Sequence, residues 1–317
     1  MPIVLYVGRR LAVTVGTLLG VSFMIFSLLA IAPGSPVTAL LGGHPPTPGQ
    51  VQELTAKYHL DDPFLVQYWH WIVNALHGDL GRSVQSNQSV TSLFEQKLPL
   101  TLELVALAML LTLLVGIPAG YVAGVRRNGG LDRAISTVSL FCISAPVFAV
   151  GILLSYVFGV QLGWLPVFGA GSGVTDRLSH LALPAVALAL GMSAVVARQT
   201  RASVMDTMDQ DYITFARARG LSRSRIVTHY VLRNSSLPIV TSVGLLAVFM
   251  ISGTVLVESV FSVPGLGSQL TGAINSKDIL VAQGTALFIA VAVVVINVLV
   301  DFAVLVLDPR TRQPRSA

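Results

Sequence analysis

The residues best suited to chemistry in this sequence are the arginines of a polar stretch between two apolar runs. The stretch covers residues 211–238 and has the pattern of a helix, a turn at Gly220 and a second helix. Its arginines are Arg217, Arg219, Arg223, Arg225 and Arg233. A guanidinium group keeps its charge and presents several donors in a fixed plane, which suits it to contacts with another protein. We expect a partner outside the membrane to hold this stretch.

A second group consists of polar residues inside apolar runs. Glu103 lies close to one end of its run, and Asn297 and Asp301 lie four residues apart, on one face of a helix. Ionisable groups at membrane depth cost free energy, so each is a hypothesis for a functional site. Two interpretations stay open for these residues: packing and orientation of the helices, or a role in a substrate path or gate.

Four histidines lie between the first and second apolar runs, at His44, His59, His70 and His77. Neutral imidazole is a common metal ligand. His70 and His77 lie seven residues apart, with no acidic or sulfur partner at ligand spacing. We therefore predict no metal site and assign these histidines to the polar edges of amphipathic helices. Cys142 is the single cysteine, which excludes disulfides and thiolate clusters within the chain.

Nucleotide chemistry is not expected in this chain. No G-x-x-x-x-G-K-[ST] segment occurs, and such a loop would be needed to bind ATP by that route. The spacing of Gly265 and Gly267 invites comparison with a phosphate loop, but no strand precedes them. They predict instead a tight re-entrant turn after Pro264.

The composition is that of a membrane protein, with 53% hydrophobic residues, 11% charged residues and a mean hydropathy of +0.75. A membrane-spanning helix needs about 20 apolar residues. Six apolar runs meet that need, at residues 11–32, 100–124, 135–160, 181–197, 238–257 and 281–307. The first run is longer than the apolar region of a secretory signal, so we predict an uncleaved span.

Arginine is concentrated in alternate gaps between these runs, at residues 9–10, 126–133, 198–233 and 310–315. The positive-inside rule then places both termini and residues 211–238 in the cytosol. This asymmetry explains the net charge of +5 and the pI near 9.7 without a nucleic-acid partner. The predicted fold is therefore an all-α membrane protein with six transmembrane helices.

The segment 33–98 lies outside in this arrangement and is too short for a confident independent domain. One amphipathic helix is predicted at residues 48–58. A second is predicted with Asp62 as its N-cap, Pro63 at the first helical position and Gly78 at its end. The chain thus divides into residues 1–32 (cytosolic end and first helix), 33–98 (a small helical extracytoplasmic insertion) and 99–317 (a core of five helices).

The polar stretch resembles the cytosolic EAA loop of ATP-binding-cassette (ABC) import permeases, in the form found in dipeptide and oligopeptide importers. The matching positions are Tyr212, Ala216, Ala218, Gly220, Leu221, Arg225 and residues 232–238. Thr214 stands where the general loop has glutamate, and Pro238 comes later than usual, which disfavours sugar and amino-acid permeases. Further resemblances lie at residues 32–36, 58–63, 163–166, 257–267 and 308–310.

The resemblance implies a type I ABC importer permease of the bacterial inner membrane, with a loop at about residues 204–237 that couples to an ATPase. The coupling residues would be Tyr212, Ala216, Arg217, Ala218, Arg219, Gly220, Leu221, Ser222 and Arg225. The residues that line a substrate path or form a gate would be Glu103, Glu258, Pro264, Gly265, Gly267, Asn297 and Asp301. The chain itself would be non-catalytic and would hold no cofactor, because ATP and Mg²⁺ would bind the partner ATPase.

The implied partners are a second, homologous permease, one or two cytosolic ATPase subunits, an extracytoplasmic substrate-binding protein and membrane lipid, with no nucleic acid. The substrate class is peptides, with haem, nickel complexes or glutathione as alternatives within the same importer class. Two readings from other classes find less support. A secondary transporter would place charges or interrupted helices near the midplane, and an intramembrane enzyme would need a catalytic constellation that the apolar runs do not contain.

Overall fold

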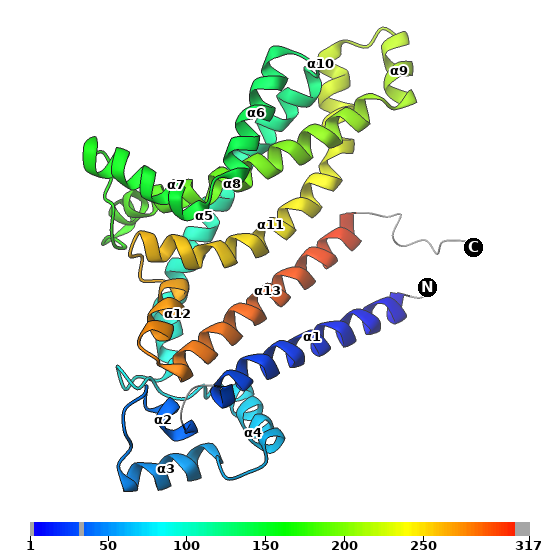
Figure 1. The fold of residues 1–317 in the computed structure, drawn as a ribbon. Helices are drawn as coiled ribbons and strands as arrows, with labels where there is room; N and C mark the ends of the chain where they lie inside the picture. Colours follow the sequence, from blue (N-terminus) through cyan, green and yellow to red (C-terminus); the bar gives the residue numbers. More distant parts are fainter. Residues whose placement is uncertain (1–2, 32–34, 308–317) are drawn as a thin grey trace. The chain divides into compact units, whose positions relative to one another are not determined.

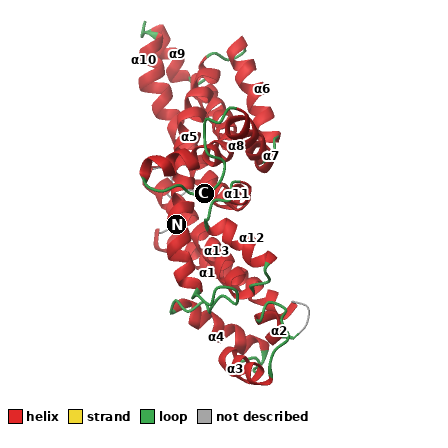
Figure 2. Cartoon of the chain, turned by 90° about the vertical axis from the view of Figure 1, so that its left-hand side faces the viewer, coloured by secondary structure: helices red, strands yellow, loops and turns green. Residues whose placement is uncertain are grey.

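The computed structural model describes residues 3–31 and 35–307 (Figure 1). Every regular element in these residues is a helix (Figure 2), apart from one isolated antiparallel bridge between Arg82 and Ser89. The all-α prediction is confirmed. The chain divides into two compact units, the first formed by residues 1–101 and 264–295 and the second by residues 102–263 and 296–317.

Four helices in the described part of the chain are long and apolar enough to cross a membrane. They are Gly8–Ile31 within α1 (Ile3–Ile31), α5 (Val90–Val125), α8 (Val174–Met208) and Ile279–Val300 within α13 (Ile279–Leu307). A bent pair of helices would make a fifth span. The remaining predicted run lies in α11 (Leu232–Val260), of which Gly244–Val260 is a shorter apolar helix. The six-span count, the cytosolic termini and the three segment boundaries stay predictions.

The apolar run predicted at residues 135–160 forms a bent pair of helices. α6 (Gly130–Ser144) ends before Pro146, and α7 (Val147–Leu154) continues into the π-helical η1 (Ser155–Gln161). The two parts are bent by 100°. A residue before proline is disfavoured in the α region, and Ala145 is accordingly extended, with φ −77° and ψ 126°. Pro184, in contrast, lies inside the continuous helix α8.

The first unit holds the short helices α2 (Pro36–Leu40), α3 (Pro48–Tyr58), α4 (Phe64–Leu76) and α12 (Leu266–Asn275) with α1 and parts of α5 and α13. One apolar core joins the start of α5, α12 and α13 through Val90, Phe94, Leu266, Ala273 and Val281. The buried carboxylate of Asp278 accepts hydrogen bonds from the Ser83 hydroxyl (2.6 Å) and the Val84 amide (3.1 Å).

Helix α3 begins and ends at the predicted residues, whereas α4 begins one residue later than predicted. Pro63 is extended (φ −54°, ψ 143°) and occupies the N-cap position, so Asp62 does not cap the helix. The hydrophobic side of α4 packs on α1 through rings: Phe64 and Tyr68 each contact Phe23 and Phe26. The Tyr68 and Ser22 hydroxyls lie 2.8 Å apart.

The segment after α11 corrects the predicted re-entrant turn. The chain turns at Ser262, which has a positive φ of 50°. Gly265 is the extended N-cap residue of α12, and Gly267 lies buried in the first turn of that helix. The amide of Leu266 donates to the Thr101 hydroxyl (2.9 Å), which satisfies one donor at this helix start. The glycines thus start a helix and do not form the turn.

The second unit is built on α8, which contributes the largest set of buried residues among its helices. Gly116, Gly120 and Gly124 form a stripe on α5 at helical spacing. A Cβ at Gly116 would lie 2.8 Å from the Ser193 carbonyl oxygen, and one at Gly120 would collide with the backbone of Ala197. Glycine therefore lets α5 approach α8 to backbone contact, as small residues do in membrane helices.

Candidate functional site

The polar stretch predicted as the coupling loop forms two short helices around a glycine. α9 (Asp211–Ala218) is followed by α10 (Arg223–Arg225), the π-helical η2 (Ile226–Val231) and α11. We call residues 211–225 the α9 elbow. In Figure 1 it lies at the end of α8, where α9 and α10 are labelled. The predicted pattern of helix, glycine turn and helix is present.

The glycine of the α9 elbow is required by its backbone conformation. Gly220 has φ 76°, the left-handed region that glycine adopts without a steric penalty. The Leu221 amide donates to the Ala216 carbonyl (3.2 Å) and the Gly220 amide to the Arg217 carbonyl (3.0 Å). This pair of bonds is the Schellman arrangement that ends a helix. A Cβ at Gly220 would meet no other atom within 4 Å, so φ alone selects glycine.

The α9 elbow is anchored by a core of its own. The core consists of Val204, Ile213, Ala216, Ile226 and Val231, with Leu221 packed against it. The resemblance to the family loop placed Ala216 among the residues that contact the ATPase. In the structure its side chain is only 4% exposed, so it belongs to the core of this chain. The small side chain is explained by this packing.

The outward face of the α9 elbow carries the groups that a partner could contact. Phe215 is 69% exposed and Tyr212 is 39% exposed, although both are aromatic. Arg217, Ala218, Arg219, Ser222 and Arg225 are exposed as well. The Ser222 hydroxyl accepts from the Arg225 amide (3.4 Å) and so caps α10. Exposed aromatic and arginine side chains on one short segment have the composition of a protein interface.

A cavity of about 450 Å³ lies at the base of the α9 elbow, lined by residues of α5, α8 and η2 together with Arg127, Arg217 and Leu221. Arg127 pairs with Asp209, with 2.7 Å between Nη1 and Oδ1. A second ion pair, between the Arg201 guanidinium and the buried Asp132, joins α8 to the start of α6. These pairs were not predicted, because each joins residues about seventy or more positions apart.

The predicted path residues fall in several places. Glu103 pairs with Arg177 (3.0 Å) beside a cavity of about 510 Å³, and this contact supports an orienting role. Glu258 is fully buried in α11, and Asn297 is exposed on α13. The side chain of Asp301, the side chains of Arg223 and Arg233, and the motif residues 32–34 and 308–310 lie outside what the structure describes.

The comparison with family models decides the class of this chain. Residues 116–313 match the model of the binding-protein-dependent transport system inner membrane component, and residues 3–105 match the N-terminal model of the same transport membrane component. The chain belongs to that family. It is therefore an ABC transporter permease and a multi-pass protein of the inner membrane.

Full-length relatives agree with this assignment. The permease is 37% identical to a putative peptide permease protein of Brucella suis over 97% of this chain and 98% of the relative. It is 38% identical to a probable peptide ABC transporter permease protein of Sinorhizobium fredii, over 97% and 99%. It is also 38% identical to the glutathione transport system permease protein GsiC of Escherichia coli K12, over 97% and 98%.

Solved structures share the fold at low sequence identity. The MetNI methionine ABC transporter in its inward-facing conformation matches with a TM-score of 0.58 and 18% identity, over 68% of this permease and 96% of that chain. An amino acid ABC transporter solved with histidines matches with a TM-score of 0.54 and 20% identity, over 67% and 92%. These likenesses support the ABC permease fold.

Proposed function

We propose that this permease is the membrane subunit of an ATP-driven importer of short peptides, which an extracytoplasmic binding protein delivers. Two of the relatives are named as peptide permeases. The permease would form the translocation path with a second permease, and a separate ATPase would supply the energy. Non-catalytic status and the absence of a cofactor from this chain are parts of the proposal.

The observation that carries the proposal is the construction of the α9 elbow. Its inner face is bound to the permease by a closed apolar core, while Phe215 and Tyr212 point outward from the same short helix. A rigid body with an exposed aromatic tip can transmit a displacement from a bound partner to α8 and α11. Coupling also requires that the partner bind the elbow with different free energies in the inward and outward states.

Glutathione is a second candidate substrate, because the Escherichia coli relative is named as a glutathione permease at the same level of identity as the peptide relatives. Both candidates are short peptides with free carboxylates. Haem and nickel complexes remain alternatives from the family resemblance alone.

The coupling proposal is tested by replacing Phe215 with glutamate in the complete transporter, reconstituted in nanodiscs with its binding protein. A charge at this exposed tip leaves the elbow core intact but cannot be buried against an ATPase without a large desolvation cost. We expect the Phe215→Glu complex to assemble poorly with its ATPase or to lose at least tenfold of its peptide-stimulated ATP hydrolysis.

The matched control is Phe215→Leu, which keeps an apolar tip and should retain most of the stimulation. Each variant is assayed with a dipeptide mixture and with glutathione, which separates the two substrate candidates. Full stimulation in Phe215→Glu would show that the α9 elbow is only a connection between helices. If neither substrate stimulates ATP hydrolysis in the parent complex, the peptide assignment is rejected. Because the hydrolysis assay would then not test the α9 elbow, co-purification of the ATPase with each variant is measured in parallel.

A further inference from the structure

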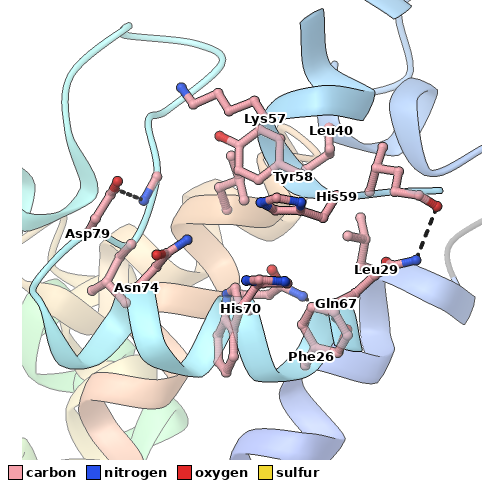
Figure 3. Close-up of a pocket in the computed structure, with 16 residues that line it drawn as sticks. Phe26, Leu29, Leu40, Lys57, Tyr58, His59, Gln67, His70, Asn74 and Asp79 are labelled. Atoms are coloured by element: carbon pink, nitrogen blue, oxygen red, sulfur yellow. Dashed lines mark hydrogen bonds between the residues drawn. The ribbon is translucent and has the colours of Figure 1, made fainter. Parts of the chain in front are cut away.

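A cluster of two histidines and one aspartate lies where α3 turns into α4. His59, Asp62 and His70 present one ligand atom each, and these atoms all lie within 4.8 Å of one another. His59 Nδ1 is 3.6 Å and His70 Nε2 is 3.9 Å from the same oxygen, Oδ2 of Asp62. The two imidazoles face each other, with centroids 4.2 Å apart. Figure 3 shows the His59 and His70 rings on the wall of a cavity.

The backbone around this cluster brings together residues that the sequence separates. His59 is the C-cap of α3 in the left-handed conformation, with φ 54° and ψ 39°, and it reverses the chain. Asp62 stands before Pro63 and is released from helix capping, so its carboxylate is free to face the two rings. His70 lies two turns into α4, on the side that faces the turn.

The turn is held in place by a side chain that lies one helical turn from His70. The Gln67 amide group donates to the Leu60 carbonyl (3.1 Å) and to the Asp62 carbonyl (2.8 Å). Residues three apart on a helix share a face, so Gln67 connects the carbonyls of the turn to the helix that carries His70. The ligand positions are thus partly organised before any ligand binds.

Although the sequence spacing predicted no metal site here, the folded turn brings Asp62 to both rings, and we propose that His59, Asp62 and His70 form a binding site for a divalent transition-metal ion. Two imidazoles and one carboxylate are a donor set used by zinc and by other first-row divalent ions. Bonds of about 2.0–2.2 Å at tetrahedral angles place ligand atoms about 3.3 Å apart. The observed separations from Asp62 are therefore within about 0.6 Å of a bound geometry. The two rings are stacked with 14° between their planes, so one ring must rotate for both nitrogens to point at a single ion.

The surroundings leave room for that movement and for solvent. The side chains of His59, Asp62 and His70 are 46%, 40% and 43% exposed. The adjoining cavity has a volume of about 110 Å³ and is also lined by Asn74, Asp79 and Tyr58. Because the three side chains are partly exposed, water can reach the remaining coordination positions.

Mg²⁺ and Ca²⁺ are disfavoured at this site, because both prefer oxygen ligands and two of the three donors are nitrogen. A bound transition ion would join the end of α3 to α4 and stiffen the turn between them. The site lies in the segment predicted to be extracytoplasmic, so the external medium would supply the ion. The inference is independent of the proposed substrate and of coupling through the α9 elbow.

The test uses the full-length permease, purified in detergent with an affinity tag that contains no histidine. Zn²⁺ is titrated in competition with a chromophoric chelator, and Mg²⁺ serves as the negative control ion. We expect one equivalent of Zn²⁺ to bind with a Kd in the micromolar range or below. His59→Gly, Asp62→Asn and His70→Gln should each raise the Kd at least tenfold. Glycine suits the left-handed backbone at residue 59, so that variant removes a ligand without straining the turn.

The matched control is His77→Gln, at the end of the same helix, where the ring nitrogen contacts the Val73 carbonyl and not the cluster. Cu²⁺ electron paramagnetic resonance gives a second readout: coupling to two imidazole nitrogens in the parent should fall to one in His70→Gln. Size-exclusion elution of each variant verifies folding. The proposal is overturned if Zn²⁺ binds no tighter than about 100 µM, well above the expected Kd, or if His77→Gln weakens binding as much as His70→Gln does.

Discussion

The α9 elbow and the turn from α3 to α4, residues 48–76, both depend on a residue with left-handed backbone, Gly220 at φ 76° and His59 at φ 54°. They differ in what anchors them. Ile213 and Ala216 of α9 are buried in an apolar core, whereas α3 and α4 contain no residue buried to that degree. We call residues 48–76 the α3 elbow.

The difference bears on what each elbow can do. Apolar burial resists deformation, because any movement of α9 against α8 opens a cavity. The α3 elbow is held by ring contacts, by partly buried Tyr58 and Leu60 at the edge of an apolar cluster, and by the hydrogen bonds of Gln67, which can rearrange at a smaller cost. The α9 elbow is thus suited to transmitting force, and the α3 elbow to adapting to a bound ion or protein.

The largest expected effect comes from Ala216→Glu, which tests the core of the α9 elbow. A carboxylate at this buried position has no partner and should destabilise the fold by about 3 kcal/mol or more. We expect loss of monodisperse protein in fluorescence-detected size-exclusion chromatography. The neighbouring variant Phe215→Glu places the same charge on the exposed face and should elute as the parent does. Equal behaviour of the two variants would refute the division into a buried and an exposed face.

A smaller effect, different at the two elbows, is expected from the left-handed positions. Gly220→Ala forces a Cβ into positive φ and should destabilise the α9 elbow by about 1 kcal/mol. His59→Gly removes such strain from the α3 elbow but adds freedom to the unfolded chain, so its net effect should be within about 0.5 kcal/mol of zero. Thermal unfolding in detergent without added metal measures both. A larger loss in His59→Gly than in Gly220→Ala would contradict the comparison.

The most localised expected effect is that of Gln67→Leu, which removes the side-chain donors to the Leu60 and Asp62 carbonyls. The cost should be about 1–2 kcal/mol and confined to the turn, because the packing of Tyr58 and Leu60 against their apolar cluster does not involve the lost donors. Hydrogen exchange should accelerate at residues 60–67 and remain unchanged at residues 211–221. The exposed Gln52 of α3 offers the control Gln52→Leu. Faster exchange across both elbows would show that the two are coupled.

The sequence by itself determined the features that depend on short-range chemistry. Apolar runs predicted the long helices, the proline and capping signals predicted α3 at its observed residues, and Gly220 predicted the turn of the α9 elbow. Several separated motifs also identified the family, because a resemblance over the whole chain does not require knowledge of contacts.

Only the tertiary structure decided the features that depend on contacts between distant residues. Composition does not indicate whether Ala216 faces a partner or its own core, because alanine suits both; packing against Val204 and Val231 settles it.

The 100° bend at Pro146 arises because its preceding residue is extended, whereas Pro184 stays within a continuous helix. Asp62 was expected to cap α4, but the extended Pro63 displaces the helix start by one residue and the reversal at His59 brings that carboxylate close to two histidines. Side-chain convergence of this kind follows from turn geometry, which local spacing along the chain does not specify.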